Sequence, residues 1–144
     1  MNTASAAAAS AVVFVWLGMV LAISFLEAPL KFRAPGVTIP VGLGIGRLVF
    51  RAVNAVEAVL AAVVIAAVAV GGSAASGVIA LTAAAAVLLL GQLAVVRPRL
   101  NRRSDRVLAG EELPRSRSHL WYVAFEAAKV AVLIALGVSL LAAR

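Results

Sequence analysis

Four long apolar stretches constrain this chain more than any other feature of its sequence. Each holds about 20 mostly apolar residues, the length that an α-helix needs to cross a bilayer. With 64% hydrophobic and 13% charged residues in 144, the composition leaves no room for a separate soluble domain. The sequence therefore predicts one all-α domain, an integral membrane up-down bundle of four transmembrane helices. We expect helices at about 6–27, 47–70, 74–96 and 119–143, joined by cytoplasmic loops 28–46 and 97–118.

Proline and glycine mark the expected breaks between these helices. Residues 30–46 contain two prolines and four glycines, so this segment is expected to form a structured loop and not a continuous helix. A glycine- and serine-rich segment at 71–77 predicts a short uncharged turn. Residues 97–118 are strongly polar and predict a hydrophilic connection that includes a short surface helix.

The basic residues predict the orientation of the bundle. Eleven of the 13 lysines and arginines lie in or beside the first and third connections. Cytoplasmic loops of membrane proteins carry an excess of such residues. We therefore expect a multi-pass protein of the cell membrane with both basic loops in the cytoplasm and both termini outside. The net charge of +7 is then explained by topology and by anionic lipid headgroups as partners, and not by nucleic acid.

Charged residues must enter the membrane in the second and fourth helices. Only 13 uncharged residues separate Glu57 from the turn at 71–77, and only 14 follow Lys129 before the last residue. Neither run spans a core ~30 Å thick at ~1.5 Å per residue. Measured by helical rise from the cytoplasmic interface, Glu57 lies ~9 Å deep, Glu126 ~10 Å and Lys129 ~15 Å. Because the helices alternate in direction, six polar groups should converge in one layer: Glu27, Asn54, Glu57, Gln92, Glu126 and Lys129.

Two interpretations of this layer remain open. It forms a cavity that faces the cytoplasm and takes a proton, a cation or a small polar ligand, or it forms a closed ion-pair network that fixes helix register. In either case Lys129 should pair with Glu126 or Glu57. The candidate ligand- or ion-binding residues are Glu27, Asn54, Glu57, Gln92, His119, Tyr122, Glu126 and Lys129.

These interpretations give three function classes. The first is proton- or cation-coupled binding and transport of a small solute. The second is a non-catalytic membrane subunit or a structural protein that binds anionic lipid. The third is a membrane enzyme that acts on a lipid or quinone, with residues 27–50 as a lid. Four thin alanine-rich helices enclose little volume alone, so we also expect a homo-oligomer or a membrane partner.

The residue types present in the chain do not identify a cofactor. The chain has no cysteine, one histidine and two methionines, so a haem held by two histidines is excluded within one chain and a soft copper(I) site has few ligands. A mixed metal site of Glu57, Glu126 and His119 remains open, although His119 beside Trp121 fits an aromatic belt at the interface. No serine or threonine forms a nucleophilic constellation with His119. Acid/base chemistry by the glutamates is the one catalytic option that remains.

Three glycines at alternate positions, 42, 44 and 46, precede an arginine. They follow no strand and lack the spacing of either nucleotide-binding fingerprint. The basic side chains near the interface are instead candidates for contact with lipid phosphates. These candidates are Arg47, Arg51 and Arg97.

Three segments carry a resemblance to known proteins. They are EAPLKFRAPGVT at 27–38, GLGIGRLVF at 42–50 and HLWYVAFEAAK at 119–129. With Asn54 and Glu57, they resemble a family of uncharacterised small bacterial four-helix membrane proteins. This resemblance covers most of the chain and implies the fold but no activity. The architecture is more distantly similar to the copper-resistance-D-like four-helix group, from which this chain departs because the histidines and methionines expected for copper or haem are missing.

Overall fold

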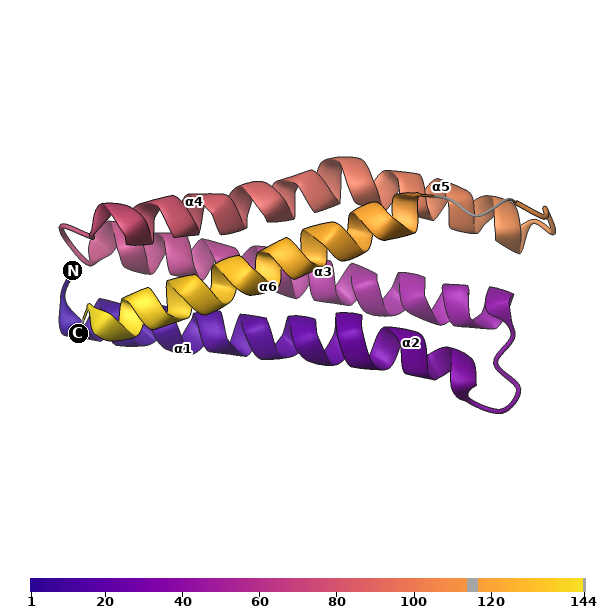
Figure 1. The fold of residues 1–144 in the computed structure, drawn as a ribbon, viewed down its shortest axis with the longest axis horizontal. Helices are drawn as coiled ribbons and strands as arrows, with labels where there is room; N and C mark the ends of the chain where they lie inside the picture. The colour runs from indigo at the N-terminus through magenta and orange to yellow at the C-terminus, as the bar shows by residue number, and fades with distance from the viewer. Residues whose placement is uncertain (114–116, 144) are drawn as a thin grey trace.

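The computed structural model describes residues 1–113 and 117–143 and shows a bundle of four long helical segments (Figure 1). No strand occurs among the described residues. Each of the four segments is long and apolar enough to cross a membrane. They indicate a multi-pass membrane protein and confirm the predicted all-helical architecture of four long apolar helices.

Two of the four segments change helix type along their length. The first joins α1 (Thr3–Val20) to a π-helical stretch (Leu21–Glu27), α2 (Ala28–Leu30) and a 3₁₀ turn (Lys31–Arg33). The second is α3 (Ile39–Val70). The third joins α4 (Ser76–Gly91) through a π-helical stretch (Gln92–Val96) to α5 (Arg97–Leu108), and the fourth is α6 (Ser118–Ala142).

The two ends of the bundle differ in their chemistry. Both termini and the α3–α4 turn lie at one end, which we call the terminal end (Figure 1). There the ammonium group of Met1 donates to the carbonyl of Ser73 at 2.7 Å, and the N–H of Asn2 donates to the carbonyl of Gly71 at 2.7 Å. The start of α3, with the connection before it, and α5 lie at the opposite end (Figure 1), which we call the basic end.

The core follows α6, which crosses the bundle diagonally from the α5 side to α1 (Figure 1). Gly137 permits this approach, because a Cβ there would lie 2.8 Å from the ring of Phe14. Small side chains let helices pack closely where lipid supplies no hydrophobic driving force between them. The largest apolar side chains that are almost fully buried are Val13, Trp16, Val20, Val64, Leu133, Leu136 and Leu140.

The structure corrects the predicted loop over 28–46. The first helical segment continues to Arg33 and α3 already begins at Ile39, so the connection is residues 34–38 alone. Pro40 lies in the first turn of α3, where a missing N–H removes no helical hydrogen bond. The hydroxyl of Thr38 accepts from the N–H of Val41 and caps the helix. The three alternate glycines are therefore helical and form no phosphate loop.

The predicted loop over 97–118 is also shorter than expected. Residues 97–108 continue the third segment as α5. Pro98 follows the π-helical stretch Gln92–Val96, where the regular α-helical hydrogen-bond pattern is already interrupted. The side chain of Arg47 pairs with Asp105 across the basic end and joins α3 to α5. With 32 residues, α3 is ~48 Å long, which exceeds a hydrocarbon core of ~30 Å. The basic end can therefore project beyond the hydrocarbon.

Candidate functional site

All four segments place a polar side chain at one level near the middle of the bundle. These side chains form the polar cluster: Trp16 on α1, Glu57 on α3, Gln92 after α4, and Glu126 and Lys129 on α6. Helical rise places each of them ~20–24 Å from the terminal end. Of the six polar groups predicted to converge, Glu57, Gln92, Glu126 and Lys129 meet here, whereas Glu27 and Asn54 do not.

Lys129 is the centre of the polar cluster. Its Nζ lies 2.6 Å from Oε2 of Glu57 and 2.7 Å from Oε1 of Glu126, and it donates to Oε1 of Gln92 at 2.7 Å. An ammonium group has three donors, and three acceptor oxygens surround this one. The Lys129 side chain has no exposed surface and each carboxylate side chain has 3%. Charges in a bilayer need such pairing because each is costly alone.

Two further donors complete the polar cluster. Nε1 of Trp16 donates to Oε2 of Glu57 at 2.9 Å. Nε2 of Gln92 donates to Oε1 of Glu126. Gln92 therefore bridges the lysine and one of its carboxylates through both ends of its amide, which fixes the third helical segment against α6.

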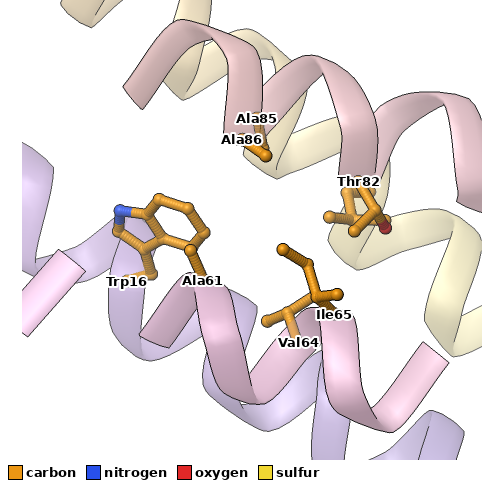
Figure 2. A pocket seen from close by; sticks show the side chains of 8 residues that line it. Trp16, Ala61, Val64, Ile65, Thr82, Ala85 and Ala86 are labelled. Carbon is orange, nitrogen blue, oxygen red and sulfur yellow. The ribbon is translucent and has the colours of Figure 1, made fainter. Parts of the chain in front are cut away.

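The indole of Trp16 closes the polar cluster toward the terminal end. Its carbon ring faces a crevice walled by Ala61 and Ala85, and its nitrogen points away from that crevice (Figure 2). The crevice contains no space that a water molecule could occupy. This crevice therefore gives water no route to the cluster.

A pocket of about 540 Å³ lies on the other side, toward the basic end. Glu126 is the member of the polar cluster that lines it. The remaining walls combine basic and aromatic groups with apolar ones. They include Lys31, Arg47, Arg97, His119 and Tyr122, and also Phe25, Phe32, Leu43, Phe50, Leu100 and Val123.

Arg97 is held in this pocket by two aromatic rings. Its guanidinium lies 4.1 Å from the ring centroid of Phe50 and 4.9 Å from that of Tyr122. The two rings meet edge to face at 5.5 Å, and the hydroxyl groups of Tyr122 and Ser24 are 3.1 Å apart. Aromatic faces attract a cation. They do not, however, supply a hydrogen-bond acceptor for each of the five N–H donors of a guanidinium.

Unpaired polar atoms remain on the pocket wall. Nε and Nη2 of Arg97 are shielded from solvent and have no hydrogen-bond partner among the described residues, and Oε2 of Glu126 is in the same condition. Buried donors and acceptors are nearly always paired in proteins, because an unpaired one costs about 1–3 kcal/mol. The pocket wall therefore carries two unpaired nitrogens of a cation, Nε and Nη2 of Arg97, and one unpaired oxygen of a carboxylate, Oε2 of Glu126.

The helix ends create this pocket. The end of α6 that borders it stops short of the end that α3 and α5 reach (Figure 1), so no fourth helix covers that part of α3. Gly42 contributes as well, because a Cβ there would overlap the ring of Phe32. The ring can therefore lie against the backbone of α3 and form a wall of the pocket.

The structure divides the predicted site residues into groups. Glu57, Gln92 and Lys129 belong to the closed cluster, and Glu126 belongs to both cluster and pocket. The pocket also takes in His119, Tyr122, Arg47 and Arg97, with His119 exposed at its edge. Three predicted residues lie outside both sets: Glu27, whose carboxylate is 3.6 Å from Lys31; Asn54, which is half-buried; and Arg51, which is exposed.

Trp16 is a member of the polar cluster that was not predicted from the sequence. Its signal was a single tryptophan in the middle of an otherwise apolar helix, since a buried indole N–H needs an acceptor. The mixed metal site of Glu57, Glu126 and His119 is not assembled: Lys129 lies between the two carboxylates. Within residues 1–113 and 117–143, no group of three or more histidine, cysteine, aspartate or glutamate side chains could hold a metal ion.

No model of a known protein family matches this chain, and no curated protein or solved structure matches it either. The resemblance to small bacterial four-helix membrane proteins therefore stays a prediction. The expected homo-oligomer or membrane partner also stays a prediction.

Proposed function

We propose that this protein binds a small solute in the pocket at its basic end and couples that binding, and transport of the solute, to a proton on Glu126. The observation that carries the proposal is the set of unpaired atoms on the pocket wall, Nε and Nη2 of Arg97 and Oε2 of Glu126. The concentration of lysine and arginine at this end supports a cytoplasmic opening, with both termini outside the cell.

Charge balance supports proton coupling. Glu57 and Glu126 carry two negative charges, Lys129 and Arg97 carry two positive charges, and both carboxylates act electrostatically on Arg97. An anion bound at Arg97 would leave this layer with a net negative charge. A proton on Glu126 restores neutrality, which a low-dielectric site favours.

The sign of the pH effect follows from this balance. The titratable and charged groups around Glu126 are Lys129 and Tyr122 on α6, Glu57 on α3 and Arg97 on α5. Lys31, Arg47 and His119 line the wider pocket. Because binding takes up a proton, the affinity for an anionic solute should rise as the pH falls.

The closed part of the polar cluster supports a second role. Glu57, Lys129, Gln92 and Trp16 are mutually paired and almost completely buried. They fix the register of four helices and support the alternative of a structural protein or membrane subunit. In that case the pocket would have no occupant.

Native mass spectrometry of the purified protein across a pH series separates the two roles. We expect the wild type to retain a ligand more strongly at low pH, Glu126→Gln to lose this pH dependence, and Arg97→Gln to lose the ligand. Arg99→Gln is the matched control, because it removes one charge from an exposed position of the same helix outside the pocket. A wild type that is empty at every pH, with variants that lose only stability, would favour the structural role.

A further inference from the structure

The depth of the pocket limits the kind of ligand that it can take. Phe50, Arg97 and Tyr122 each lie ~30 Å from the terminal end by helical rise, which equals the thickness of the hydrocarbon core. Gly42 and Arg47, farther along α3, lie ~35–42 Å from that end. With the terminal end set at one boundary of the hydrocarbon, the pocket would run from the other boundary into the headgroup layer, where amphipathic molecules reside.

The pocket walls combine charge with apolar surface at short range. The guanidinium of Arg97 rests on Phe50 and Tyr122, and Nζ of Lys31 lies 5.6 Å from the Phe32 ring centroid and 5.7 Å from that of Phe50. A small inorganic anion would pair with Arg97 but leave the apolar wall exposed to water. A neutral hydrocarbon would cover the apolar wall but leave the guanidinium unpaired.

A second pocket extends the site along the basic end. It measures about 560 Å³ and shares four lining residues with the first: Leu43, Leu100, Ser104 and His119. Val107 and Leu120 add apolar surface to it, and Arg103 and Arg117 add positive charge. Two pockets with common walls form a groove that suits an elongated ligand better than a compact one.

We infer that the ligand is an amphipathic anion, a carboxylate or phosphate attached to a hydrocarbon chain. Its anionic group meets Arg97 and its chain lies along the apolar side of the groove. This inference rests on the proposed function and names its ligand class. A phospholipid of the bilayer and a free fatty-acid-like anion share this chemistry.

Three probes isolate the two halves of the ligand. Dodecanoate carries the anionic group and the chain, acetate carries the group alone, and dodecanol carries the chain alone. Binding is measured to the whole protein in lipid nanodiscs, with empty nanodiscs as the reference for partitioning into lipid. We expect the wild type to bind dodecanoate about tenfold or more tightly than acetate and dodecanol, as loss of a charge-assisted hydrogen bond or of a buried chain predicts.

Two pairs of variants test the groove itself. Arg97→Gln should weaken dodecanoate binding about tenfold or more, whereas Arg99→Gln should leave it within about twofold. Gly42→Ala displaces the Phe32 ring and should also weaken binding. Gly44→Ala is its control, because a Cβ there meets no atom within 4 Å.

The outcomes separate this inference from the proposed function. Acetate or dodecanol binding as tightly as dodecanoate would overturn the amphipathic ligand, while pH-linked binding that depends on Glu126 would leave the proposed function standing. Failure of all three probes, together with an empty wild type in mass spectrometry, would overturn both. The lipid of the nanodisc then identifies the source of the ligand. Weaker dodecanoate binding in phosphatidylglycerol than in phosphatidylcholine nanodiscs would indicate that an anionic lipid competes for the groove and is its natural occupant. Equal binding in both lipids would indicate a free anion.

Discussion

Lys129→Met should destabilise this protein more than any other single change in the polar cluster. Methionine keeps the length and apolar stem of lysine but removes the ammonium group that pairs with both Glu57 and Glu126. The two carboxylates then remain at hydrocarbon depth without a cation at 2.6 and 2.7 Å. Their remaining donors are the indole of Trp16 and the amide of Gln92, neither of which carries charge.

The size of the effect follows from burial and pairing. Removing one partner of a buried ion pair costs about 3–5 kcal/mol, because the other charge is left uncompensated. Here one cation serves two carboxylates that are only 3% exposed, so solvent screening offers little relief. We expect the free energy of unfolding to fall by about 3–5 kcal/mol, which is about two to four powers of ten in the unfolding equilibrium constant.

Reversible unfolding in mixed detergent micelles, followed by circular dichroism, measures this change. The matched variant is Lys129→Met with Glu57→Gln, which removes one positive and one negative charge and restores the wild-type net charge of the cluster. It should recover a large part of the lost stability. A single variant within about 1 kcal/mol of the wild type, or a double variant no more stable than the single one, would refute the ion-pair reasoning.

Two further predictions concern the tryptophans and the orientation. Trp16→Phe removes the indole donor to Glu57 and should lower the free energy of unfolding by about 1.5–3 kcal/mol in the same assay, whereas Trp121→Phe, at an exposed position, should change it by less than about 0.5 kcal/mol. Because the chain has no cysteine, single cysteines report topology cleanly. A membrane-impermeant maleimide should label Ser73→Cys in intact cells and Ala109→Cys only after permeabilisation; the reverse pattern would contradict the proposed orientation.

Residue counts along the chain were enough to predict four long helices and the common level of Glu57, Gln92, Glu126 and Lys129. Apolar length requires spans, and too few uncharged residues separate Glu57 from the turn at 71–77 for this charge to stay outside the hydrocarbon. Alternating helix direction then places Gln92 and Glu126 at the same level. These conclusions depend on residue counts along single helices, so they needed no tertiary information.

The predicted loop over 28–46 was wrong because it was based on proline and glycine content. Their low helix propensity predicted a loop through residue 46, but Pro40 occupies a first turn where it removes no hydrogen bond, and Gly42 accommodates the Phe32 ring. Propensity is a weak local preference of about 1 kcal/mol for glycine, and packing between helices overrides it. Which glycine makes such a contact depends on a residue ten positions away, on another helix.

Packing between the helices determines which polar residues belong to the closed cluster and which line a pocket. Helical spacing predicted Asn54, Glu57 and Glu126 alike as members of one site. In the structure, the rotation and crossing of the helices leave Asn54 outside both the cluster and the pocket. They place Glu57 against Trp16 and turn Glu126 toward the pocket. The two unpaired nitrogens of Arg97 likewise belong to a guanidinium that lies against rings on α3 and α6, which no local pattern connects. Contacts between helices are set by axial rotation and crossing angle, which the periodicity of one helix does not contain.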